Sequence, residues 1–351
     1  MVDGQVVGVT GISGLIGQRL LPLLDASPHV ERIVGLDVRD PARRARKLDF
    51  HRLDVFGSEL TPYLRNVDVV VHLAAVVGPM PDAELFTRVN VDGTRVLLAA
   101  LGASGVRKVV RPSSAAVYGA WANNPVPITE DAPLRPNPGY LPAIVDAECE
   151  RLLVEWASSH DGRLATRLRI APVLGGGASS LLSMIATGRL PVHVRGATPP
   201  VQVVHLDDAA AALELAAVTD LDGAYNVAAD GWLEHDEARA LLPVRRTPPL
   251  PAELAERVLA AAWATGLGDA PPSVLPYLVH PYVVANDRLK QAGWKPGHSN
   301  DETILLATGA EPDHLVVWLA AAGAATAVAA LSAWLLRWRR SRNRRRSVAR
   351  V

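Results

Sequence analysis

Eight residues near the N-terminus, 10-TGISGLIG-17, have the types and spacing of a phosphate-binding loop. They follow a short apolar run and precede a helical pattern, so the loop lies where a strand leads into a helix. Gly11 permits a tight turn, Gly14 lets a phosphate group approach the backbone, and Gly17 lets helix and strand pack closely. The free N–H groups and partial positive charge at the start of the helix favour an anion. The loop therefore predicts pyrophosphate binding.

An acidic residue, Asp37, stands where a dinucleotide site needs one. It lies 20 residues after Gly17, at the end of the second predicted strand. A carboxylate at this point accepts hydrogen bonds from the adenosine ribose hydroxyls and repels a 2′-phosphate. The pattern favours NAD over NADP, while Arg39 nearby keeps NADP open as the alternative.

The stretch 139-GYLPAIVDAECE-150 raises the question of whether the chain also performs chemistry. A phenol has an unperturbed pKa of about 10, so it is a poor base at neutral pH unless a nearby cation stabilises the phenolate. Tyr140 is followed four residues later by Ile144, and no lysine lies between Lys108 and Lys290. The local sequence therefore supplies no lysine to activate Tyr140.

Alternating strands and helices must hold these residues in place. This alternation over the first third predicts an α/β fold, a doubly wound parallel sheet with right-handed crossovers. The expected strands are 6–10, 32–37, 67–75 and 106–114, and the expected helices are 15–24 and 89–105. The strand at 67–75 is apolar almost throughout, as expected for a strand covered on both faces.

Six further motifs follow the glycine loop. In chain order they are RLDV (52–55), HLAA (72–75), VNVDGT (89–94), SSAAVYG (113–119), VVHLDD (203–208) and GAYNVA (223–228). Together with the loop they make the chain resemble the extended short-chain dehydrogenase/reductase family over about residues 4–300. That family includes NAD-dependent epimerases and dehydratases that act on nucleotide sugars, and it has a Rossmann-type sheet with a smaller substrate region.

The resemblance implies a cofactor site and a catalytic site. Asp54 takes the position of the acid that contacts the adenine, Asn90 that of a structural asparagine, and Ser114 that of the catalytic serine or threonine. The implied NAD-binding residues are Gly11, Ser13, Gly14, Leu15, Ile16, Gly17, Asp37, Asp54, Val55, Leu73, Ala74, Ala75 and Asn90, and the implied catalytic residues are Ser114 and Tyr140. A lysine four residues after the family's tyrosine lowers the tyrosine pKa and holds the nicotinamide ribose.

Two registers place this chain differently on the tyrosine and lysine positions. In the first, Tyr140 is the family's tyrosine and Ile144 takes the lysine position. In the second, the helix is aligned through 147-AECERLL-153, so Pro142 takes the tyrosine position and Asp146 the lysine position. Neither register supplies a cation. One hypothesis is an oxidoreductase that acts on a nucleotide sugar or lipid-linked relative; the other is a catalytically silent NAD-binding scaffold or sensor.

The C-terminal segment, 313–351, differs in composition from the rest of the chain. The run LVVWLAAAGAATAVAALSAWLL (315–336) has 22 residues without a charge. As a helix it spans about 33 Å, enough for a hydrocarbon core of about 30 Å. Trp318 and Trp334 lie near its ends, where an aromatic belt belongs. We therefore expect a transmembrane helix after an NAD-binding domain at 1–170 and a substrate-side region at 171–312; a buried core helix is the alternative.

The arginine-rich tail leaves the orientation of that helix open. The tail favours the cytoplasmic side, yet the N-terminus lacks the pattern of a signal peptide, and an NAD-binding domain needs cytoplasmic nucleotide. A tail anchor, or a shallow helix with domain and tail on one face, would resolve the conflict. The expected location is a membrane, with the main domain in the cytoplasm.

Charge and cysteine content exclude several classes of protein. Eight arginines lie in 337–351, so residues 1–336 hold 28 basic and 36 acidic side chains, a net charge of −8. This acidic body argues against nucleic acid as a partner. The single cysteine, Cys149, excludes an internal disulfide framework. No cluster has metal-ligand spacing. The expected partners are a small-molecule substrate, a membrane and, as the resemblance implies, a second copy in a homodimer.

Overall fold

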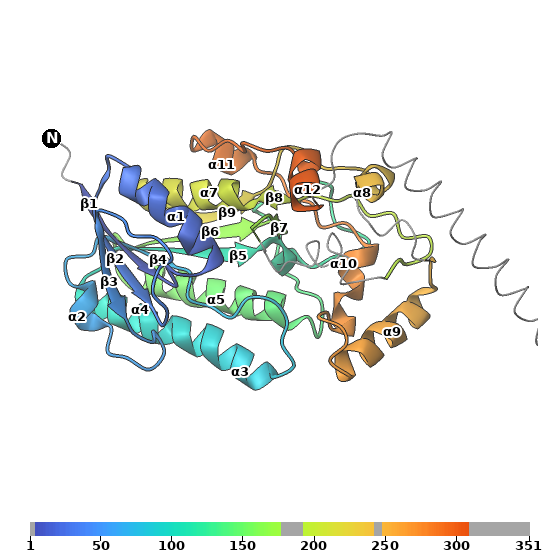
Figure 1. Ribbon diagram of the computed structural model, residues 1–351, viewed down its shortest axis with the longest axis horizontal. Helices are drawn as coiled ribbons and strands as arrows, with labels where there is room; N and C mark the ends of the chain where they lie inside the picture. Colours follow the sequence, from blue (N-terminus) through green and yellow to red (C-terminus); the bar gives the residue numbers. More distant parts are fainter. Residues whose placement is uncertain (1–3, 177–191, 242–247, 309–351) are drawn as a thin grey trace, which may run out of the picture. The chain divides into compact units, whose positions relative to one another are not determined.

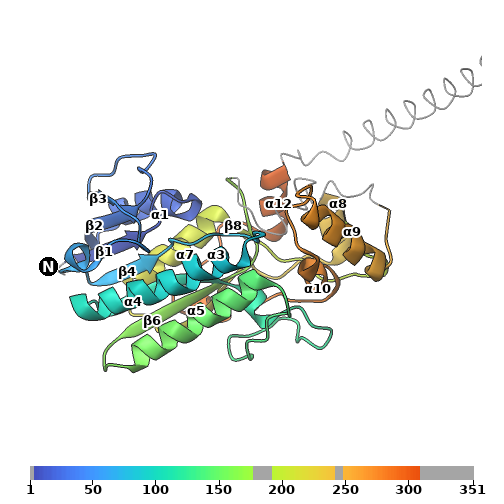
Figure 2. The ribbon, with the colours of Figure 1, turned by 90° about the horizontal axis from the view of Figure 1, so that it is seen from below.

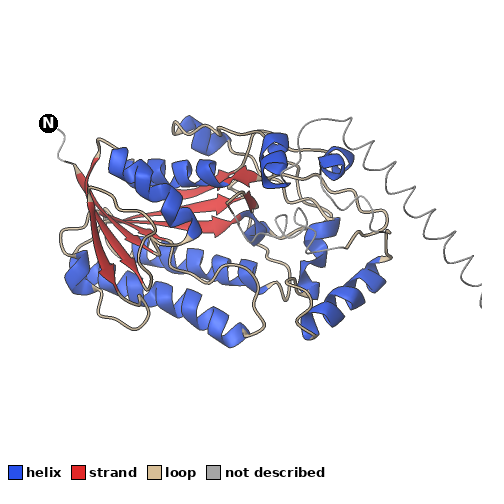
Figure 3. Ribbon diagram, viewed as in Figure 1, coloured by secondary structure: helices blue, strands red, loops and turns tan. Residues whose placement is uncertain are grey.

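A seven-stranded parallel sheet organises the fold in the computed structural model, which describes residues 4–176, 192–241 and 248–308 (Figures 1 and 3). The strands in spatial order are β3 (Leu48–Arg52), β2 (Val30–Asp37), β1 (Gln5–Thr10), β4 (Val69–His72), β5 (Lys108–Ser114), β6 (Leu164–Ile170) and β9 (Gly223–Val227). The chain runs outward from β1 in one direction and then from β4 in the other. The crevice beyond β1 and β4 is thus the point where ligands bind in such sheets. The predicted doubly wound α/β sheet is confirmed.

Helices cover both faces of the sheet (Figures 1 and 2). One layer holds α1 (Leu15–Ala26), α7 (Leu206–Val218) and α11 (Asp287–Gln291). The other layer holds α2 (Thr61–Leu64), α3 (Ala83–Thr87), the π-helical turn η1 (Arg88–Asp92), α4 (Gly93–Ser104) and α5 (Leu141–Ser158). Beyond the carboxyl ends of β5 and β6 lie α8 (His235–Leu241), α9 (Ala252–Ala264), α10 (Leu275–Val279) and α12 (Asn300–Thr308).

The strand side chains alternate between two hydrophobic cores. In β4, Val69 and Val71 join the core beneath α1 and α7, while Val70 joins the core beneath α4 and α5. Because successive side chains in a strand point to opposite faces, a strand covered on both sides must be apolar at every position. This explains the continuous apolar run in the sequence.

The segment expected to form the substrate side also contributes to the sheet. β9 pairs with β6, and α7 packs beside α1. Between β6 and α7 the chain also forms a small parallel pair of strands, β7 (Val173–Leu174) with β8 (Val204–His205). The chain thus leaves the sheet at residue 170, builds a region beyond the strand ends, and returns.

The predicted transmembrane helix at 315–336 must be corrected. Residues 309–351 lie outside the part of the chain that the structure describes, and within that part no helix is both long and apolar enough to cross a bilayer. The longest helix there, α5, carries the buried carboxylate of Glu150 on its sheet-facing side. The fold is therefore described without a membrane-spanning helix.

Candidate functional site

The three glycines of the first loop lie at the carboxyl end of β1, and each meets a different environment. Gly11 has φ +73°, and a Cβ there would lie 2.6 Å from the backbone nitrogen of Ala74. A Cβ on Gly17 would lie 2.4 Å from the carbonyl oxygen of Ile12. At Gly14, by contrast, only the Gly11 carbonyl oxygen comes near, at 3.1 Å. Gly11 and Gly17 thus allow close backbone packing, while Gly14 leaves open space at the helix start.

Helix α1 begins at Leu15 with no side chain capping its first N–H groups. No acidic residue lies in its first turn. Uncapped N–H groups at a helix start need acceptors from outside the helix, and a pyrophosphate supplies them. The loop residues Ser13, Leu15 and Ile16 therefore surround a place that fits a dinucleotide phosphate.

The Asp37 carboxylate lies at the end of β2, next to this loop. It accepts hydrogen bonds from the backbone N–H of Ser13 at 2.9 Å and of Arg39 at 3.0 Å. Asp37 is buried, whereas Arg39 is exposed. Each carboxylate oxygen has a second lone pair, so Asp37 retains acceptors for ribose hydroxyls. The structure brings Asp37 and the glycine loop together as the sequence predicts.

The remaining cofactor residues follow the neighbouring strands. Leu73, Ala74 and Ala75 follow the end of β4, and the Leu73 N–H donates to the Thr10 carbonyl oxygen at 2.9 Å. Asp54 is exposed beyond β3, while Val55 beside it is buried. All of these residues lie beyond the carboxyl ends of β1 to β4.

Asn90 has a structural role that does not require a ligand. Its side-chain oxygen accepts from the Val76 N–H at 2.8 Å, and its amide donates to the Val76 carbonyl oxygen at 3.1 Å. It therefore fixes the loop that follows β4 by pairing with both backbone groups of one residue.

Ser114 is the last residue of β5 and caps the short 3₁₀ helix η2 (Ala115–Tyr118). Its hydroxyl oxygen accepts from the Ala116 N–H at 3.1 Å. The hydroxyl hydrogen stays available to a substrate oxygen. Ser114 also pairs in register with Ile170, the last residue of β6.

Tyr140 stands immediately before α5 and packs against Tyr277, with ring centroids 4.7 Å apart. Within the described residues its hydroxyl has no hydrogen-bond partner. Burial raises the pKa of Tyr140 to about 12, and the charge of Asp146 adds to the shift. Tyr140 is therefore a neutral phenol at pH 7, which donates a proton rather than accepting one.

The orientation of α5 gives different surroundings to the residues that the two registers place at the lysine position. Ile144 is 39% exposed, so the first register places its lysine position toward solvent. Asp146 instead faces the sheet, and its Oδ1 accepts from Nη1 and Nη2 of Arg111 at 3.0 Å each. One turn earlier on this face is Pro142, in the first turn of the helix. The lysine position of the second register is thus occupied by an ion-paired aspartate on the sheet-facing side of α5, and that of the first register by a partly exposed isoleucine.

A second buried ion pair holds the same face of α5 one turn later. The Glu150 carboxylate accepts from Arg169 Nη2 at 2.8 Å and from the Ser113 hydroxyl at 2.7 Å. Glu150 and Asp146 are four residues apart, so both point to the sheet. Burial raises the pKa of Asp146 despite the nearby Arg111.

Sequence reasoning missed both ion pairs, although a signal was present. Arg111 and Arg169 interrupt apolar strands of a sheet covered on both faces. Because a buried charge requires a partner, two such arginines predict two carboxylates on the covering helix. The pattern does not say which carboxylate pairs with which arginine.

A pocket of about 100 Å³ opens directly beyond β6. Its wall begins with Ala171 and Pro172, which follow the residue that pairs with Ser114. Tyr277 also lines it, and the Tyr277 hydroxyl donates to the Ala116 carbonyl oxygen at 2.9 Å. One lining residue of the pocket is therefore hydrogen-bonded to the turn that follows Ser114, although Ser114 itself does not line the pocket. The sequence did not single out its other lining residues.

Comparison with known proteins matches this architecture. The model of the NAD dependent epimerase/dehydratase family matches residues 7–228. An uncharacterized protein of Mycobacterium tuberculosis is 31% identical over 258 residues, 70% of this chain and 67% of its own length. The UDP-glucose 4-epimerase of Thermus thermophilus, crystallised in complex with NAD, is 25% identical with a TM-score of 0.64, over 87% of this chain and 98% of its own. MoeE5 in complex with UDP-glucuronic acid and NAD has a TM-score of 0.66 at 23% identity, over 87% and 98%.

Proposed function

Because the chain belongs to the NAD-dependent epimerase/dehydratase family, we propose that it is an oxidoreductase that binds NAD at the glycine loop and acts on a nucleotide sugar. The observation that carries the proposal is the pocket beyond β6, whose wall begins with the residues that follow Ile170, the register partner of Ser114 on β5. A ligand in this pocket lies at the carboxyl edge of the sheet, on the side of β5 and β6. The glycine loop lies at the same edge, at β1.

The cofactor side of the proposal is supported by the loop geometry. The open space at Gly14, the uncapped start of α1 and the Asp37 carboxylate suit the pyrophosphate and adenosine ribose of NAD. When bound, the nicotinamide supplies hydride acceptance and donation. Relatives of the same fold were crystallised with NAD.

The chain's own residues are suited to binding and orienting a substrate. The Ser114 hydroxyl can donate to a substrate oxygen, because it needs only its own oxygen to cap η2. Tyr140, as a neutral phenol, can donate a proton but is a poor acceptor. Oxidation of a sugar hydroxyl therefore requires a proton acceptor other than a tyrosinate activated by lysine.

A second candidate function is a catalytically silent module that binds NAD and a nucleotide sugar without turnover. The observation that favours it is the Arg111–Asp146 ion pair. In the second register Asp146 takes the position from which a lysine would lower the pKa of a tyrosine, and its negative charge raises the pKa of Tyr140 instead. Binding and catalysis must therefore be measured separately.

The first experiment is a fluorescence titration of the full-length protein with NADH. Replacing Asp37 by Ala removes acceptors for the ribose, so we expect about tenfold weaker binding, the effect of about 1.4 kcal/mol. Asp40→Ala is the control, because Asp40 is an exposed carboxylate that pairs with Arg52 on the surface. No saturable binding by a folded wild-type sample would refute the cofactor assignment.

The second experiment incubates the NAD-loaded protein with UDP-glucose and UDP-glucuronic acid and follows the sugar by NMR. An epimerised, oxidised or dehydrated product that disappears in Ser114→Ala supports the oxidoreductase. Binding of NADH and of the sugar nucleotide without any product supports the silent module instead. The expected homodimer and the cytoplasmic location of residues 1–312 stay predictions.

A further inference from the structure

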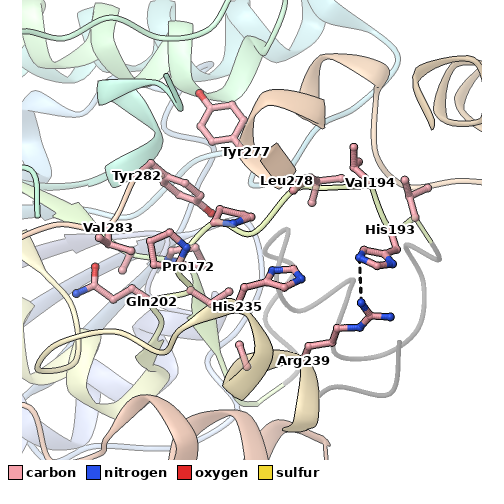
Figure 4. A pocket seen from close by; sticks show the side chains of 17 residues that line it. Pro172, His193, Val194, Gln202, His235, Arg239, Tyr277, Leu278, Tyr282 and Val283 are labelled. Carbon is pink, nitrogen blue, oxygen red and sulfur yellow. Dashed lines mark hydrogen bonds between the residues drawn. The ribbon is translucent and has the colours of Figure 1, made fainter. Parts of the chain in front are cut away.

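The walls of the pocket beyond β6 are mostly apolar (Figure 4). Of the seventeen described residues that line it, eleven are prolines or have aliphatic side chains. The two aromatic residues, Tyr277 and Tyr282, lie across the pocket from His193 and Arg239. A group that enters the pocket therefore exchanges water for a largely aliphatic and aromatic surface.

Two of the polar side chains in the walls already form hydrogen bonds within the protein. The Gln202 amide donates to the carbonyl oxygens of Gly231 at 2.8 Å and Val284 at 3.0 Å, and its oxygen accepts from the Val284 N–H at 2.8 Å. The Tyr277 hydroxyl donates to the Ala116 carbonyl oxygen at 2.9 Å. Neither side chain therefore offers its donor to a ligand.

The ionisable nitrogen-bearing residues of the walls lie together on one side of the pocket. Nη1 of Arg239 donates to Nε2 of His193 at 3.1 Å. The rings of His193 and His235 are nearly parallel, 21° apart in plane, with centroids separated by 6.1 Å. A hydrogen bond and a ring contact thus hold these three side chains against one another.

The opposite wall, which includes Tyr282, Pro172 and Val283, carries one hydroxyl group. The Tyr282 ring packs edge-on against Tyr277, with centroids 5.2 Å apart. Among the described residues the Tyr282 hydroxyl has no hydrogen-bond partner. Burial raises the pKa of Tyr282, with a further contribution from Tyr140, so the phenol is neutral at pH 7 and donates a hydrogen bond. This wall therefore suits one oxygen atom of a ligand.

The size and polarity of the pocket limit what can enter it. An apolar cavity of about 150 Å³ admits benzene, so a pocket of about 100 Å³ admits a group of about five or six carbon atoms. A sugar ring of that size brings several hydroxyls, and each hydroxyl that loses water without gaining a partner weakens binding. The wall around Tyr282 supplies a partner for a single oxygen. An alicyclic or aliphatic group with one oxygen is therefore the better fit.

We propose that the pocket beyond β6 binds an uncharged alicyclic or aliphatic group whose single oxygen accepts a hydrogen bond from Tyr282. This inference rests on the proposed function, because it takes this pocket as the substrate site. It narrows the substrate to an alcohol or ketone with an apolar group beside its reacting oxygen, such as a sugar with few free hydroxyls. An unmodified glucose ring fits poorly, because most of its hydroxyls would lack partners.

The test compares cyclohexanol with glucose, two six-membered rings that differ in their number of hydroxyls. Each is titrated into the full-length protein in the presence of NADH, which cannot accept a hydride from the alcohol. Saturation-transfer NMR follows binding. We expect saturable binding of cyclohexanol, and binding of glucose that is at least about tenfold weaker, because several hydroxyls would be buried without partners.

Two variants locate the site and test the role of the hydroxyl. Tyr282→Phe should weaken cyclohexanol binding about 3- to 10-fold, as expected for loss of one neutral hydrogen bond. Its matched control is Tyr63→Phe on α2, outside the pocket. Leu278→Asn should weaken binding at least about tenfold, because it places a polar amide in the apolar wall. Its control is Leu267→Asn, since Leu267 is 86% exposed and does not line the pocket.

Unchanged melting temperature and NADH affinity show that each variant is folded with its cofactor site intact. If Leu278→Asn unfolds, Tyr282→Phe carries the comparison. Equal cyclohexanol affinity in the wild type and Tyr282→Phe, glucose binding as tight as cyclohexanol binding, or no cyclohexanol binding to the folded wild type would each overturn the proposal. Turnover of UDP-glucose together with any of these results leaves the proposed function standing. Cyclohexanol binding without NADH binding instead refutes the cofactor assignment alone.

Discussion

Removing one partner of the Arg111–Asp146 ion pair should destabilise the protein much more than removing both. The Arg111 side chain is 6% exposed and the Asp146 side chain 22%. Truncating one partner of a buried pair costs about 3–5 kcal/mol, because the other charge is left buried without compensation. With an unfolding entropy of about 2.1 cal/mol/K per residue and about 300 folded residues, Asp146→Ala should lower Tm by about 5–8 °C.

The double substitution Arg111→Met/Asp146→Leu should behave differently. It replaces the pair by apolar side chains of similar total volume, and such replacements are neutral or stabilising by about 1–4 kcal/mol. Burial raises the pKa of Asp146 even beside Arg111, so for this carboxyl group the attraction of the arginine does not fully offset the desolvation. The pKa of Arg111 is also raised, because the nearby acidic groups outweigh its own desolvation, so the two partners point in opposite directions. We take the Asp146 side as decisive, because a guanidinium is charged at any pH near neutrality in either case. Urea unfolding and calorimetry of the wild type, both single variants and the double variant form a double-mutant cycle. A single variant within about 1 kcal/mol of the wild type, or a double variant as unstable as the sum, would refute this reasoning.

The pair also decides how the missing lysine could be restored. Pro142→Tyr with Asp146→Lys supplies the family's residue types but places a second cation against Arg111. We therefore expect that double variant to be unstable, and turnover to appear only when Arg111→Met is added. A stable and active double variant would show that Arg111 moves freely away from α5.

Two further predictions concern the glycine loop and acid stability. Gly14→Ala should leave Tm nearly unchanged, because its Cβ meets only one protein atom, yet it should weaken NADH binding at least about tenfold. Gly17→Ala should instead cost about 1–3 kcal/mol of stability, because its Cβ would overlap the backbone. Calorimetry measures the stability of each variant, and fluorescence titration measures its NADH affinity. Burial, with a contribution from Arg111, lowers the pKa of His72 to about 3. Below about pH 6.5 the unfolded state therefore binds a proton at His72 that the folded state does not bind. The free energy of unfolding should fall from pH 6.5 to pH 3, by at most about 5 kcal/mol. His72→Gln should make the urea midpoint depend less steeply on pH between pH 6.5 and 4. The same pH dependence in the variant and the wild type would contradict this.

Features set by short-range pattern were predictable from the sequence. The glycine loop, β2 with Asp37 at its end, and the helix end at Gly105 each depend on neighbouring residues. Gly105 adopts φ +76°, which a glycine adopts without strain, and α4 ends there. The expected strand 67–75 is shorter in the structure, Val69–His72, because the chain leaves the sheet at Leu73.

Features set by contacts between distant residues were not predictable. Arg111 meets Asp146 across 35 residues, and Arg239 meets His193 across 46. Nothing in either local sequence specifies the partner, since each pairing depends on how helices lie over the strand ends. For the same reason the sequence did not show that Asp146 faces the sheet while Ile144 is partly exposed, which depends on how α5 lies over the strands.

The position of β9 limits where the chain can be divided. β6 ends the segment 1–170, but its outer edge hydrogen-bonds to β9 through Thr166 to Ile170. A fragment that stops at residue 170 exposes that edge and loses α7, whose alanine-rich face covers the sheet beside α1. An unpaired edge of a long central strand is a template for other chains. A fragment of residues 1–170 would therefore contain the cofactor motif but would associate with other chains. A fragment made for expression should end after residue 227, so that β9 is included.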